Sequence, residues 1–164
     1  MSSPVTQDDI VQAAVTWLLG FPDVLAALGT FVIDGELAPG LFQYETWTPI
    51  EGSSSTACVI NNDGGWTGPN QHNTLRFPRL LVEILADPMR DSGFNNTDSG
   101  EVRRRATAAF TAIDAHLHRP QGGTMLWGQL RVVESVRLTE PMIYRVPDGD
   151  GLVRLQTYYA VTQG

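Results

Sequence analysis

The sequence predicts one α+β domain in which helices pack on a single sheet. Its 164 residues, 42% of them hydrophobic, suffice for one ordinary core and one domain spanning residues 1–164. Residues 80–86 are apolar at nearly every position, which indicates a buried strand. Residues 102–117 repeat apolar side chains at helical spacing. We therefore expect a two-layer α/β (α+β) sandwich, with one main helix across a mixed or antiparallel sheet of four to five strands and an N-terminal helical segment.

The N-terminal segment reads as two helices. Thr6 is a suitable N-cap with Asp9 three residues later, so the first helix should begin near Gln7 and end at Gly20. Residues 22–28 predict a short second helix, because proline suits a first turn and Gly29 a stop. Residues 31–41 are expected to form a loop or an irregular strand.

The middle of the chain predicts two short strands, residues 42–47 and 57–61, followed by a polar ribbon. Residues 61–74 are rich in Gly, Asn and Pro and cannot pack a core of their own. We expect this ribbon to be mobile in free subunits and ordered in an assembly, with Trp66 buried against another chain.

The second half of the chain predicts the main helix and the remaining strands of the sheet. Residues 80–86 should form a central strand covered on both faces, with Glu83 as its polar exception. Asp98 with Glu101 predicts the start of the main helix. The last segment predicts strands over residues 126–138, 143–146 and 152–161, with a glycine-containing hairpin loop before the last of them.

The composition argues against several classes of function. The formal net charge of −7 argues against nucleic-acid binding, although all eleven basic residues are arginine. Cys58 is the only cysteine, which excludes an intramolecular disulfide and fits a reducing cytoplasm. The acidic start does not resemble a signal peptide, and no apolar run is long enough for a membrane span.

No catalytic residue, metal ligand or cofactor site is predicted. The Asp148 and Asp150 loop lacks the further oxygen ligands of a calcium site. His116 and His118 are two residues apart, so on a helix they point in different directions and suit solvated positions.

Partner contacts are the more informative possibility. Arg103, Arg104 and Arg105 lie in the first turn of a helix, where cations oppose the dipole, and only Arg105 has a local partner in Glu101. Three interpretations remain for these arginines: a solvated face, contact with an acidic neighbouring subunit, or contact with nucleic acid. Tyr158 and Tyr159 alternate across the last strand, so one can face a partner. The predicted interface residues are Trp66, Asn70, His72, Arg76, Arg103, Arg104, Arg105 and Tyr158.

Several stretches resemble the tail terminator proteins of long-tailed bacteriophages. They are Asp63-Gly64-Gly65-Trp66, Pro69-Asn70-Gln71-His72-Asn73, Arg76-Phe77-Pro78-Arg79 running into residues 80–88, His118-Arg119-Pro120-Gln121-Gly122-Gly123, and Glu140-Pro141 through Asp150-Gly151.

The resemblance implies a structural virion protein without catalytic residues. Its subunits would form a ring, usually of six, that caps the tail tube at the head-proximal end and receives the head connector or stopper. Assembly in the host cytoplasm and passage of DNA without specific binding are also implied. Two alternatives remain: another head-to-tail joining protein, such as a stopper or adaptor, and a small metal-dependent hydrolase using Asp148, Asp150 and a histidine.

Overall fold

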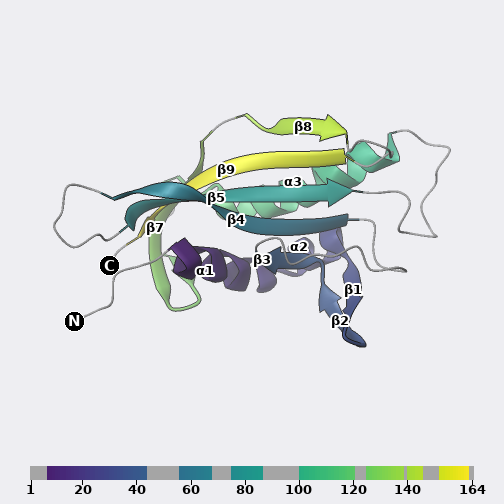
Figure 1. Ribbon diagram of the computed structural model, residues 1–164, viewed down its shortest axis with the longest axis horizontal. Helices are drawn as coiled ribbons and strands as arrows, with labels where there is room; N and C mark the ends of the chain where they lie inside the picture. The colour runs from purple at the N-terminus through teal and green to yellow at the C-terminus, as the bar shows by residue number, and fades with distance from the viewer. Residues whose placement is uncertain are drawn as a thin grey trace.

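The computed structural model describes residues 7–43, 56–67, 75–86, 100–120, 125–138, 140–145 and 152–162. In these residues, three helices cover one face of a mixed, seven-stranded sheet (Figure 1). The predicted two-layer α+β class is confirmed. The sheet has more strands than the four to five expected, because the polar ribbon and the last third of the chain contribute longer or additional strands.

The sheet contains one parallel pair, and its other pairs are antiparallel. β3 (Leu41–Gln43) runs parallel to β4 (Thr56–Thr67), and β4 is followed by β5 (Leu75–Ala86) and β9 (Leu152–Thr162). β9 then carries two strands on its other side, which are β7 (Leu130–Arg137) and β8 (Met142–Arg145). β6 (Met125–Trp127) pairs with β7. The late strand β9 therefore lies in the interior of the sheet.

The helices follow the sequence periodicity closely. α1 (Gln7–Leu19), α2 (Pro22–Leu28) and α3 (Glu101–Leu117) place their apolar stripes in one core with the sheet. The N-cap of α3 is Gly100, without a side-chain cap, whereas the predicted caps Thr6 and Asp98 lie outside the described residues. No single helix described here is long and apolar enough to cross a membrane; α1 and α2 reach that length only across a 95° bend.

The prediction that residues 80–86 are covered on both faces is only partly correct. Leu80, Val82 and Ile84 are buried against the helices. Leu81 and Glu83 point to the other face and are half-buried there. Because that face is less covered, a carboxylate is tolerated in the middle of the strand.

The polar ribbon is not wholly a loop. Its first half continues β4 through Thr67 and pairs with β5, with bulges after Asn62 and Trp66. Backbone pairing supplies the hydrogen bonds that a loop would lack, and bulges absorb the irregular residues. β9 pairs with β5 only as far as Arg79. The residues beyond that point therefore form a two-stranded extension (Figure 1), here called the β4–β5 arm.

A second two-stranded unit occupies the segment predicted as a loop or an irregular strand. β1 (Thr30–Ile33) and β2 (Glu36–Pro39) form an antiparallel hairpin. Its turn is Asp34-Gly35, with φ of 50° and 81°, as a two-residue hairpin turn requires. In Figure 1 the hairpin stands away from the sheet. Phe31 fixes its base by packing edge-on against Phe42, with ring centroids 5.6 Å apart.

The histidines at the end of α3 are part of the packing, which corrects their assignment as solvated. His116 Nε2 lies 3.1 Å from Asp23 Oδ2, and its ring stacks on Phe21 at 3.5 Å. Trp17 Nε1 donates to the His116 carbonyl, 3.1 Å away. His118 Nδ1 accepts a hydrogen bond from the Arg137 backbone N–H. These contacts hold the three helices and β7 together.

Candidate interface surfaces

The three arginines occupy the exposed first turns of α3, but they are more neutralised than the sequence suggested. Glu101 accepts hydrogen bonds from both Arg104 and Arg105, each at 3.0 Å. These two bonds, with Arg105 the larger influence, hold the pKa of Glu101 below its ordinary value. The expectation that Arg104 has no local partner is therefore wrong. Arg103, also exposed, remains the arginine best placed to contact another molecule.

The β4–β5 arm carries two of the predicted interface residues. Trp66 lies in β4 opposite Phe77, and Arg76 in β5 is the extra residue at the adjoining bulge. Asn70 and His72 lie outside the described residues. A bulge redirects side chains and commonly ends regular pairing. The arm thus brings Trp66 and Arg76 to one end of the sheet.

Tyr158 is not an interface residue. Its side chain is fully buried, because Tyr158 pairs with Leu80 on the helix-facing side of the sheet. The Tyr158 hydroxyl donates to Asp114 Oδ1 at 2.6 Å, and Arg137 Nη1 donates to Oδ2 of the same carboxylate at 2.8 Å. Tyr159 takes the opposite face, where its hydroxyl donates to Glu134.

This buried tyrosine makes stability sensitive to alkaline pH. Burial, followed by the hydrogen bond to Asp114, raises the pKa of Tyr158 above its ordinary value of 10.0, and burial raises that of Cys58 above 9.0. The folded state therefore holds both protons more tightly than the unfolded state. The resulting stability is complete below pH 9 and decreases as the pH rises.

In urea unfolding experiments between pH 8 and pH 11, the free energy of unfolding should decrease by about 1.4 kcal/mol per pH unit for each of the two groups once the pH exceeds that group's ordinary pKa. The variant Tyr158→Phe should lose the contribution of Tyr158 to this pH dependence and keep that of Cys58. A Tyr158→Phe slope equal to that of the wild type would contradict the assignment.

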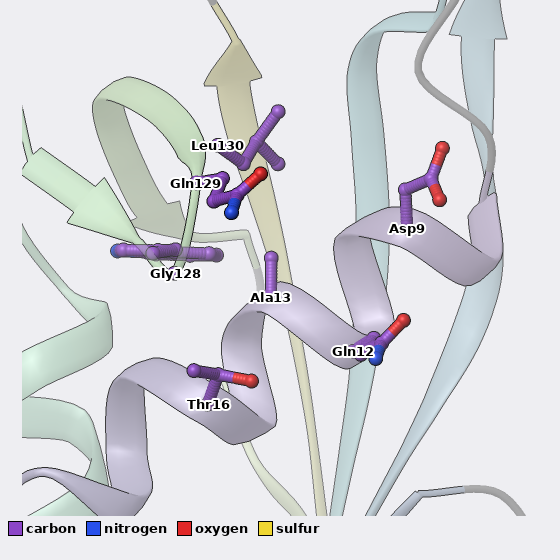
Figure 2. Close-up of a pocket in the computed structure, with 8 residues that line it drawn as sticks. Asp9, Gln12, Ala13, Thr16, Gly128, Gln129 and Leu130 are labelled. Carbon is purple, nitrogen blue, oxygen red and sulfur yellow. The ribbon is translucent and has the colours of Figure 1, made fainter.

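A polar hollow of about 400 Å³ lies between α1 and the turn from β6 to β7. Figure 2 shows Gln129 and Leu130 across from Ala13 and Thr16, with Asp9 farther along the helix. Trp127, which is fully buried, completes the lining. The lining of this hollow offers one carboxylate, amides and a hydroxyl for hydrogen bonding. It holds no acid and base placed as a catalytic pair. The hollow therefore suits polar contacts with a partner better than it suits catalysis.

The described residues contain no group of three or more histidine, cysteine, aspartate or glutamate side chains that could hold a metal ion. Asp148 and Asp150, the carboxylates of the hydrolase alternative, lie outside the described residues. Cys58 is fully buried with a raised pKa, so its thiol is poorly suited to act as a nucleophile.

Large exposed apolar side chains mark further surfaces. On the β1–β2 hairpin, Val32 and Leu37 form a cross-strand pair, 42% and 76% exposed. At the opposite edge of the sheet, Met142 and Ile143 of β8 are 64% and 43% exposed, beside exposed Leu138. Grouped apolar side chains in solvent are typical of contact surfaces.

These features define a two-layer α+β fold whose candidate contact surfaces are its two-stranded extensions, its strand edges and its exposed charged side chains. Comparison with solved structures agrees on the fold. The chain is similar to a chain of the solved structure described as the virion of a native gene transfer agent particle, with a TM-score of 0.56 and 19% sequence identity. The similarity covers 93% of this chain and 94% of that one. No family model and no curated protein matches the sequence.

Proposed function

We propose that this protein is a structural subunit of a phage-like virion. The observation that carries the proposal is the shared fold over nearly the whole of both chains, since the matching chain belongs to a virion particle. The surfaces agree with such a role: two extensions, an exposed strand edge and arginines at the start of α3. This role is structural and involves no enzymatic activity.

Within that class, we propose the tail terminator. Copies of the chain form a ring, with six as the expected number, that caps the tail tube at its head-proximal end, ends tube polymerisation and offers a surface to the head connector. The proposal is supported by the sequence stretches that resemble this family, several of which fall on the β4–β5 arm and on β8.

Charge gives the proposed ring a physical property. Six copies with a formal charge of −7 each give about −42, a field that repels phosphate and lets DNA pass without adhering. Like-charged subunits must then be held by local contacts, with roughly 800 Å² buried per partner.

Deleting the gene from the producing phage or particle tests the role. A terminator is required to stop tube growth, so the deletion should give tails of uncontrolled length that lack heads, as measured by electron microscopy. Supplying the wild-type chain should restore uniform length. Purified protein should also form a ring by light scattering after gel filtration.

Tails of normal length that fail to join heads would instead identify another head-to-tail joining protein, such as a stopper or adaptor. Normal tails already joined to heads would contradict both roles.

A further inference from the structure

The β1–β2 hairpin is unlike the rest of the fold, because its two strands make a sheet of their own. A two-stranded hairpin is marginally stable when isolated in water. Phe31 holds the base, but the outer pair of Val32 and Leu37 remains in solvent. Packing this pair on another surface would bury apolar area and stabilise the hairpin.

β8 offers a surface of matching kind. It is a four-residue strand, and among the described residues only β9 pairs with it. Its exposed Met142 and Ile143, together with nearby Leu138, are here called the β8 edge. Strands at a sheet edge present unpaired backbone groups, which commonly accept a strand from another chain.

The hairpin and the β8 edge cannot meet within one subunit. The hairpin directly precedes β3 at one edge of the sheet, whereas β8 lies beyond β4, β5 and β9 at the other (Figure 1). Contact between them must join two copies through different surfaces. Such head-to-tail contacts close into rings when the rotation between copies allows it.

Charge complementarity favours a second copy as the occupant. At the tip of the hairpin, Asp34 in the turn and Glu36 at the start of β2 are both exposed. The β8 edge lies beside α3, because Arg154, the partner of Ile143, lies 3.5 Å over the Phe110 ring of α3, where its own charge is balanced by Asp114. Arg103 is seven residues before Phe110, so it lies on the same side of α3 and is exposed there.

We propose that the β1–β2 hairpin of one subunit docks on the β8 edge of the next, with Leu37 packing against Ile143 on the face of the sheet that α3 covers and the acidic tip of the hairpin facing Arg103. The inference rests on the proposed ring and specifies the contact that builds it. It also gives Arg103 a defined partner.

Cysteine cross-linking tests the contact in the full chain. Cys58 is buried and its pKa is raised, so its thiol should not react with the reagent. Any cross-link should therefore come from the introduced cysteines. The double variant Leu37→Cys with Ile143→Cys should form a ladder of covalent oligomers with a short bifunctional thiol reagent. The matched control combines Leu37→Cys with Leu126→Cys, which lies on β6 and is also exposed, and it should not form the ladder.

A charge exchange tests the polar half of the interface. Arg103→Glu and Glu36→Arg should each shift the oligomer to smaller species by at least tenfold in dissociation constant, and the double exchange should restore most of that loss. Double exchange without recovery would overturn the proposed pairing.

The cross-linking and tail-length experiments distinguish failure of the hairpin contact from failure of the terminator role. If the wild type forms a ring but only the control pair cross-links, the hairpin contact is wrong and the terminator role stands. If the wild type stays monomeric and tails still have uniform length without it, both are overturned.

Discussion

Replacing Phe110 with alanine should lower the free energy of unfolding by about 3 to 5 kcal/mol, a large part of the stability of an ordinary domain. Phe110 is 7% exposed, in the core between α3 and the sheet. The substitution leaves a cavity and also removes the ring beneath the Arg154 guanidinium, a contact of 3.5 Å. Urea or thermal unfolding followed by circular dichroism measures the effect.

Thr107→Ala is the matched control, because Thr107 is exposed on the same helix. It should change stability by no more than about 0.5 kcal/mol. A Phe110→Ala variant as stable as this control would mean that α3 does not pack through Phe110.

Removing the Asp114 carboxylate should have the second largest effect, about 2 to 4 kcal/mol for Asp114→Ala. The carboxylate accepts hydrogen bonds from Tyr158 and Arg137 and carries the charge opposite Arg154. Without this carboxylate, the buried Tyr158 hydroxyl and the partly buried guanidinium groups of Arg137 and Arg154 lose their common partner. Chemical denaturation at neutral pH measures the loss.

Asp114→Asn keeps the shape and one acceptor, so it should retain part of the stability. Glu101→Ala on the same helix breaks two ion pairs at the protein surface, one exposed and one half-buried, and should change the free energy of unfolding little. If Asp114→Ala and Glu101→Ala lowered the free energy of unfolding equally, the contacts of Asp114 with Tyr158 and Arg137 would contribute no more than a surface ion pair.

The helices were the most predictable part of the fold, because their signals are local. The Pro22 start and the Gly29 stop of α2, and the apolar repeat of α3 through Leu117, appear where the sequence places them. Each depends on residues within one or two turns. The start of α3 differs because Gly100, not Asp98, is the N-cap, and Glu101 binds arginines instead.

The strands were harder to predict, because their partners are distant in sequence. The Gly-rich end of β4 becomes a strand only by pairing with β5. The β1–β2 hairpin did have a local signal that the sequence interpretation missed: Asp34-Gly35 between two apolar runs, the dipeptide that a tight hairpin turn prefers.

Tyr158 was wrongly predicted as an interface residue for a related reason. Alternation shows that Tyr158 and Tyr159 face opposite ways, but not which of them faces the helices. That choice follows from register, since Tyr158 is paired with buried Leu80. The hydrophobic edge of β8 carries no signal in the sequence, because exposed and buried apolar residues look alike until the neighbouring strands are known.

The interior position of β9 has a consequence during synthesis on the ribosome. Every other described strand is made before β9, yet β5 on one side and β7 and β8 on the other are joined only through it. A nascent chain that lacks residues 152–162 leaves both halves of the sheet with open edges. Contacts between strands so far apart in sequence also form slowly. The β8 edge thus exists as a strand only once β9 has been added, so unfinished chains lack the surface that the proposed contact requires.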